Sequence, residues 1–199
     1  MLLRQGQSIV LLSLTRNSAD ASSEDDWANI VKHLLLTAYP ELGLRIEIRE
    51  CGAFHGEWTE GGWLEAVWMI RPDWLVVPSF AGGERSEIAM TPERFRTRLH
   101  RLLADTSAHA KRSVLFSPIE ADEADADADV HAQYAEIVHD AAMKPGCLYV
   151  DAKPAIGRAR DRHAHLGSGP ETAEARRADI ETSLAYAFLE CIGFRWVRY

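Results

Sequence analysis

The chain has 199 residues, of which 47% are hydrophobic and 26% charged, and its formal net charge is −8. This length and composition fit one globular domain spanning residues 1–199. The acidic balance argues against a nucleic-acid partner, which requires a basic surface to neutralise phosphates. A membrane partner is not expected either, because no apolar run approaches the roughly 20 residues that cross a bilayer.

The cysteines indicate a reducing compartment. Cys51, Cys147 and Cys191 are odd in number, lie far apart and show no metal-type spacing. Free thiols of this kind are typical of cytoplasmic proteins, and Met1 is not followed by the charged, apolar and cleavage regions of a secretory leader. We therefore expect a cytoplasmic protein with no metal and no cofactor.

Five short apolar runs alternate with segments of helical periodicity. Their β-branched and aromatic residues are typical of strands covered on both faces, as in a parallel sheet. The second run alternates between apolar and polar residues, which favours a position at the edge of the sheet. The five runs are Ser8–Leu12, Leu44–Ile48, Trp74–Val77, Ser113–Ser117 and Cys147–Asp151.

Apolar residues at helical spacing predict helices between these strands. The best-marked helix starts at Thr91-Pro92, where a side-chain cap is followed by proline at the first helical position. The apolar faces run through Trp27–Leu35, Trp63–Ile70, Phe95–Leu103, Tyr134–Ala141 and Ile180–Cys191. This strict alternation predicts an α/β protein with three α/β/α layers, built on a flavodoxin-like, doubly wound, five-stranded parallel sheet.

One segment, residues 120–129, consists almost entirely of Asp, Glu and Ala. A solvated loop that leads into the following helix explains it, because carboxylates are favoured near a helix N-terminus. A calcium site is the alternative, but the glycine-punctuated ligand spacing of calcium loops is absent.

A ligand site is expected beyond the carboxyl ends of the strands, where doubly wound sheets bind their ligands. That rule selects the loops that follow each apolar run. We expect the late segment Asp161–Pro170 to be a loop that reaches the same edge of the sheet.

Several blocks of the sequence carry a family resemblance, in their order and spacing. RQGQSIVLLSLTRN, AYPELGLRIEIRECGA, RPDWLVVPSFAGG, TPERFRTRLHRLL and CLYVDAKPA follow one another along nearly the whole chain. Together they resemble the blocks of the SGNH (G-D-S-L) hydrolase family. The resemblance implies the SGNH hydrolase fold and a cleft built for ester hydrolysis.

The positions that carry the chemistry in that family differ here. An alignment without a gap places Thr15 at the nucleophilic serine, whereas a two-residue shift places Ser13 there. The family's Asp-x-x-His block falls on Leu166–Pro170, which contains neither residue. A hydroxyl is a poor nucleophile without a base and a group that orients the base. We therefore expect very little esterase activity unless other residues replace the missing base.

The resemblance also implies an oxyanion hole. Its first donor is a backbone N–H that maps to Gly52 or Ala53, and its asparagine donor falls on Gly82, which has no side chain. Loss of one such donor typically costs roughly a hundred- to a thousand-fold in turnover.

Histidines near the degenerate block are the candidate replacements for the missing base. His163 or His165 can serve if the loop brings either ring over Thr15 or Ser13, and His55 is a further candidate. A His-x-His pair also suits a metal, but without further spaced ligands the signal is weak. Exposed polar loop residues are the simplest interpretation.

The aromatic residues and Cys51 allow functional and structural interpretations. Large aromatics are usually packing residues, and we expect Trp27, Trp68 and Trp74 in the core. Trp58 and Trp63 are candidates for a stacking platform. Cys51 has no identified base beside it and fits a small buried apolar residue better than a nucleophile.

Two functional hypotheses follow. The first is a protein with this fold that has lost the usual esterase triad and acts as a non-catalytic binder of a small ligand or as a partner subunit, with a homo-oligomer among the options. The second is an active esterase or acylhydrolase, for example on acetylated sugars, that uses Thr15 or Ser13 with His163 or His165.

Overall fold

A computed structural model describes residues 1–14, 26–51, 63–77, 91–118, 128–166 and 173–195. The strands are β1 (Ser8–Leu14), β2 (Arg45–Cys51), β3 (Trp74–Val77), β4 (Arg112–Phe116) and β5 (Cys147–Val150). The helices are α1 (Trp27–Ala38), α2 (Trp63–Ile70), α3 (Pro92–Ser107), α4 (Ala128–Ala142), α5 (Lys153–Leu166) and α6 (Ala173–Cys191), with a 3-10 turn η1 (Pro40–Leu42).

The five strands form one parallel sheet in the order β2-β1-β3-β4-β5. This is the predicted flavodoxin-like arrangement, with the order reversing between β1 and β3. The alternating second run lies at a sheet edge, as expected, and all four residues of β3 are buried.

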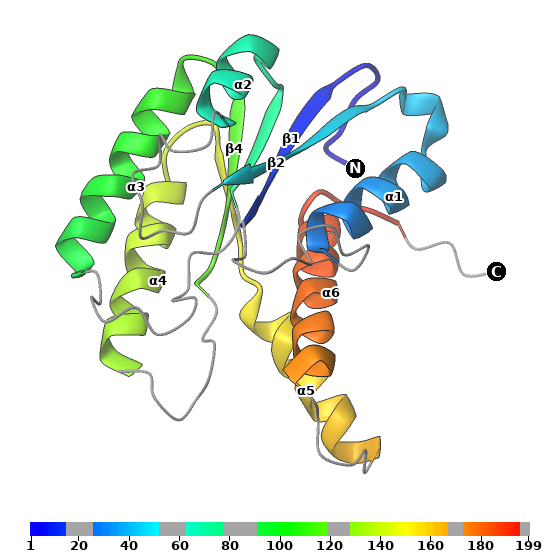
Figure 1. Cartoon of the computed structure of the whole chain (residues 1–199), viewed down its shortest axis with the longest axis vertical. Coiled ribbons are helices and arrows are strands. Elements are labelled where there is room, and N and C mark those ends of the chain that lie inside the picture. Colours follow the sequence, from blue (N-terminus) through cyan, green and yellow to red (C-terminus); the bar gives the residue numbers. More distant parts are fainter. Residues whose placement is uncertain (15–25, 52–62, 78–90, 119–127, 167–172, 196–199) are drawn as a thin grey trace.

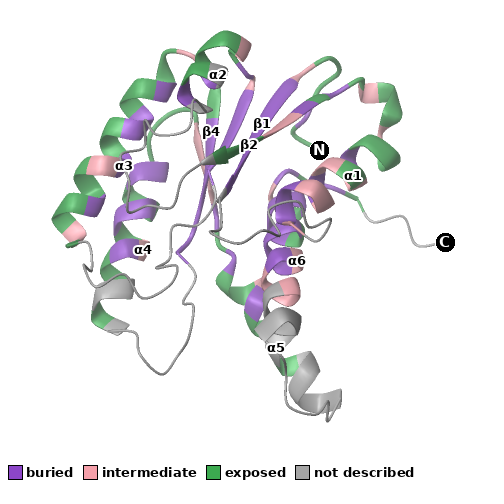
Figure 2. Ribbon diagram, viewed as in Figure 1, coloured by how far each residue is buried: buried purple, intermediate pink, exposed green. Residues whose placement is uncertain are grey.

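Helices cover both faces of the sheet (Figures 1 and 2). On one face α1 and α6 pack together, and Trp27, Leu35 and Phe188 belong to their apolar cluster. On the other face α2, α3 and α4 enclose a second cluster that includes Phe95 and Leu99. The two clusters give the three predicted layers.

The local signals at α3 are confirmed. The Thr91 hydroxyl accepts a hydrogen bond from the Arg94 N–H at 3.4 Å, and Pro92 stands at the first helical position. Trp27 and Trp74 are buried, as expected.

Two expectations are wrong. Trp68 is 41% exposed, because α2 turns Leu64 and Val67 toward the sheet and leaves the next residue on its outer side. The expected loop before the last helix is instead helical as far as Leu166, the end of α5. Its Ala- and Arg-rich composition favours helix.

Candidate functional site at the carboxyl edge of the sheet

Ser13 lies near the carboxyl end of β1 and is hydrogen-bonded to a carboxylate. Its hydroxyl donates to Asp26 Oδ2, and its side chain is 6% exposed. Asp26 is also the N-cap of α1, because Oδ1 accepts the Ala28 N–H at 2.7 Å. One carboxylate therefore joins the end of β1 to the start of α1.

A second carboxylate meets the same helix end. Glu181 comes from α6, is 6% exposed, and accepts the Trp27 N–H through Oε2 at 3.3 Å. Negative groups are favoured at a helix N-terminus, where N–H groups lack partners within the helix. The Trp27 ring packs edge-on against Phe116 at 5.3 Å between ring centroids, so the start of α1 is fixed from both sides.

Ser117 ties the ends of β4 and β5 together. Its buried hydroxyl accepts the Ala152 N–H at 2.9 Å, and its own N–H donates to the Val150 carbonyl at 2.8 Å. Ser117 is the last residue of the predicted apolar run Ser113–Ser117, and that position was its sequence signal. Burial first and the charge of Asp151 second raise the pKa of the neighbouring Tyr149 hydroxyl.

Most residues singled out from the sequence lie outside the described part of the chain. Thr15, Gly52, Ala53, His55 and Gly82 fall in the undescribed segments, as does Trp58. Their assigned roles stay predictions.

His163 and His165 lie near the end of α5, and only their backbone is described. At 1.5 Å per residue, His163 is about 15 Å along the helix axis from Lys153. Figure 1 shows α5 leaving the carboxyl edge and extending away from the strands. The backbone therefore does not carry this histidine pair back across the sheet toward Ser13.

The cysteines that the structure describes are poor nucleophiles. Cys147 and Cys191 are free, half-buried thiols, and burial raises the pKa of each. A thiol with a raised pKa has little thiolate at neutral pH. The side chain of Cys51 lies outside the described residues.

A hollow of about 640 Å³ lies along α4 and the end of β5, where Gln133, Glu136, His139, Tyr149 and Asp151 line it. His139 and Tyr149 meet edge to face at 5.2 Å between ring centroids. Neither Ser13 nor Asp26 lines this hollow.

Within the described ranges no three His, Cys, Asp or Glu side chains are grouped so that they can hold a metal ion. No helix in those ranges has the length and apolar character needed to cross a membrane.

Comparison with known proteins identifies the fold. No protein-family model matches the chain. An acetylxylan esterase from Geobacillus stearothermophilus is 26% identical over 175 residues, which cover 83% of this chain and 80% of that protein. The crystal structure of Axe2, an acetylxylan esterase from the same organism, superposes with a TM-score of 0.72 at 21% identity, covering 100% of this chain and 99% of that chain.

The chain has the SGNH hydrolase fold. LAE5, an alpha/beta hydrolase enzyme from the metagenome of Lake Arreo in Spain, gives the same TM-score of 0.72 at 19% identity, with 98% of both chains covered. These comparisons confirm the resemblance to SGNH hydrolases that the sequence blocks indicated. Structures of Axe2 include catalytic mutants in which a serine, a histidine or an aspartate is replaced by alanine.

Proposed function

We propose that this SGNH-fold protein is an esterase that hydrolyses acyl esters of carbohydrates, with acetylated xylo-oligosaccharides as the substrate class. The observation that carries the proposal is the hydrogen bond from Ser13 to Asp26 at the carboxyl end of β1. Likeness to an acetylxylan esterase over 83% of the chain supports it. The relative supplies the substrate class, and the described geometry supplies a hydroxyl with a proton acceptor.

Ser13 is the proposed nucleophile, with Asp26 as its base. The Ser13 oxygen bonds to the acyl carbon while its proton passes to Asp26 Oδ2. The bond from the acyl carbon to the sugar oxygen then breaks, and Asp26 returns the proton to that oxygen. An ester on Ser13 remains.

Water completes the cycle at the same two residues. The water oxygen bonds to the acyl carbon, and its proton passes through Asp26 to the Ser13 oxygen as the carboxylic acid leaves. The backbone N–H groups of Gly52 or Ala53 and of Gly82 are the proposed oxyanion donors. Because Gly82 offers no side-chain amide, we expect a turnover roughly a hundred- to a thousand-fold below that of an esterase with the full set of donors.

Thr15 with His163 or His165, or with His55, is the competing assignment within the same function. Thr15 occupies the nucleophile position in the ungapped resemblance, but the backbone course of α5 favours Asp26 over His163 and His165 as the base. Substitution of each hydroxyl separates the two assignments.

A non-catalytic binding protein is the second candidate, and the burial of Ser13 favours it. Ser13 is 6% exposed, and Asp26 already caps α1 through its other oxygen. Both features also fit a purely structural contact. On this alternative the protein binds the acetylated sugar without releasing acetate.

The test measures acetate release from acetylated xylo-oligosaccharides by the unmodified protein and by Ser13→Ala, Asp26→Asn, Thr15→Ala and His165→Ala. We expect Ser13→Ala and Asp26→Asn to lose at least about a hundred-fold in kcat/KM, because either change removes the attacking oxygen or its base. Thr15→Ala and His165→Ala are expected to stay within about ten-fold of the unmodified protein.

Asp26→Ser separates the two duties of Asp26. Serine can still cap a helix but cannot take the proton, so folding measured by circular dichroism should persist while activity is lost. Acetate release no faster than a buffer blank by the unmodified protein would contradict the proposal, as would full activity of Ser13→Ala.

A further inference from the structure

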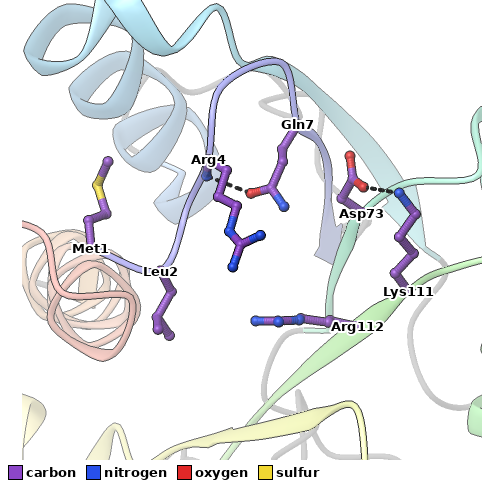
Figure 3. Close-up of a pocket in the computed structure, with 7 residues that line it drawn as sticks. All are labelled: Met1, Leu2, Arg4, Gln7, Asp73, Lys111 and Arg112. Atoms are coloured by element: carbon purple, nitrogen blue, oxygen red, sulfur yellow. Dashed lines mark hydrogen bonds and ion pairs between the residues drawn. The ribbon is translucent and has the colours of Figure 1, made fainter.

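A second hollow lies at the amino edge of the sheet, opposite Ser13. It has a volume of about 410 Å³ and is lined by residues at the starts of β3 and β4 and from the segment before β1 (Figure 3). Five steps of about 3.3 Å separate Ser8 from Ser13 along β1, or about 17 Å. This amino-edge pocket is therefore separate from the proposed esterase site.

The carboxylate of the pocket, Asp73, is paired with the Lys111 ammonium group. Asp73 accepts from Lys111 Nζ at 2.6 Å through one oxygen, and from the Ser8 N–H at 2.8 Å and the Ser8 hydroxyl at 3.2 Å through the other. The Lys111 hydrogen bond, followed by the Ser8 N–H, lowers the pKa of Asp73. Its charge is thus matched by Lys111 and does not oppose an incoming anion.

Two further cations of the pocket, both guanidinium groups, have no carboxylate partner in the part of the chain that the structure describes. Among the described residues neither Arg4 nor Arg112 forms an ion pair. The Arg112 guanidinium lies over the Trp74 ring at 5.0 Å from its centroid. That contact orients the guanidinium without cancelling its charge.

Gln7 contributes a directed donor. Its Oε1 accepts the Arg4 N–H at 2.8 Å and the Trp74 indole N–H at 3.2 Å. Both partners can only donate, so the atom facing them must be the oxygen and the side-chain NH₂ must point the other way. Figure 3 shows the Gln7 amide and the Arg4 and Arg112 side chains around the same hollow.

The turn that carries Arg4 is built into the fold. Gly6 adopts φ +74°, a conformation that glycine takes without strain, and its N–H donates to the Leu42 carbonyl at 2.8 Å. The Leu2 N–H donates to the Ile192 carbonyl at 2.8 Å, and Leu3 is buried in the core. Arg4 is therefore held at the pocket from both sides.

We propose that the amino-edge pocket binds a phosphate dianion, either inorganic phosphate or a phosphate monoester. Two guanidinium groups and one amide supply fork-shaped donors and two charges, which match a doubly charged oxyanion. The chain as a whole carries a net charge of −8, so attraction to the protein in general does not account for anion binding. The binding energy must come from the local cluster.

Isothermal titration with inorganic phosphate at low ionic strength tests the proposal. We expect saturable binding that weakens at least about ten-fold, or about 1.4 kcal/mol, in Arg4→Gln and in Arg112→Gln. Arg112→Lys keeps the charge but not the fork and should bind with intermediate strength. Acetate release by the same variants should be unchanged, which separates this result from the proposed function.

Arg101→Gln is the matched control. Arg101 lies on α3, its side chain is 80% exposed, and the substitution changes the net charge by the same amount. We expect phosphate binding by this variant within about two-fold of the unmodified protein. Absence of saturable binding, or equal weakening by Arg101→Gln and Arg112→Gln, would overturn the proposal.

Discussion

Among single residues, Asp73 has the best-defined electrostatic role. Its side chain is 16% exposed, and it joins the start of β3 to Lys111, which precedes β4, and to Ser8 at the start of β1. A hydrogen bond to a charged group contributes about 1.5–3 kcal/mol in favourable settings. Asp73 therefore stabilises the amino edge of three adjacent strands.

Asp73→Asn should reduce the free energy of unfolding by about 1–2 kcal/mol at pH 7. The lowered pKa in the folded state means that the carboxylate stabilises the protein above its unfolded pKa, near 3.8, and that this stabilisation is lost as the pH falls through the folded value. Urea denaturation at pH 7 and pH 3 should show the difference from the unmodified protein shrinking at the lower pH.

Asp105→Asn is the control for that substitution. Asp105 is 43% exposed, and its ion pair within the described ranges is the 3.9 Å contact with Arg101, which predicts a change below about 0.5 kcal/mol. A difference between Asp73→Asn and the unmodified protein that grows toward pH 3 would contradict the role given to Asp73.

The sequence predicts individual residues where the signal is local. The cap at Thr91-Pro92 and the burial of Trp27 and Trp74 depend on neighbouring residues and on strand or helix periodicity, and both are confirmed. The pairing of Ser13 with Asp26 spans 13 positions and depends on how α1 returns to β1. No local pattern contains that information.

At the scale of elements, α6 anchors one face of the sheet. Phe188 is fully buried and meets Trp27 and Phe116 at 6.4 Å between ring centroids in each case. These three aromatics join α6, α1 and β4 next to the helix end that Asp26 caps. Packing on this face therefore supports the geometry of the candidate site.

Phe188→Ala should lower the free energy of unfolding by about 3–5 kcal/mol, because it opens a cavity between α6, α1 and the sheet. Met69→Ala is the control, since Met69 is 86% exposed on α2 and should change stability by less than about 0.5 kcal/mol. Chemical denaturation of both variants checks this, and equal effects would contradict the described core.

The sequence predicts the bounds of elements with strong apolar periodicity closely, but it does not predict the full length of α5. The strands match within a few residues because buried parallel strands are continuous apolar runs. The sequence of α5 lacks a clear apolar stripe, and the doubly wound pattern predicted a loop from Asp161 onward. Helix propensity and contact with α6 decide the structure of α5. Because the contact with α6 is a tertiary interaction, the local sequence does not reveal it.

For the whole molecule, the order of apolar runs and helical segments was enough to predict the sheet and its helical layers. The strand order β2-β1-β3-β4-β5 and superposition on Axe2 with a TM-score of 0.72 confirm that prediction. Chemistry does not follow from the fold alone, because one fold supports many activities. It depends on Ser13, Asp26 and the residues that complete their site.

The most direct measurement is to trap the acylated protein. The protein is mixed with 4-nitrophenyl acetate, quenched in acid and digested with trypsin, and tandem mass spectrometry locates the acetyl group within residues 5–16. We predict an acetyl ester on Ser13 that disappears in Ser13→Ala and fails to form in Asp26→Asn. An acetyl group on Thr15, or no acetylation of this peptide in the unmodified protein, would contradict the account.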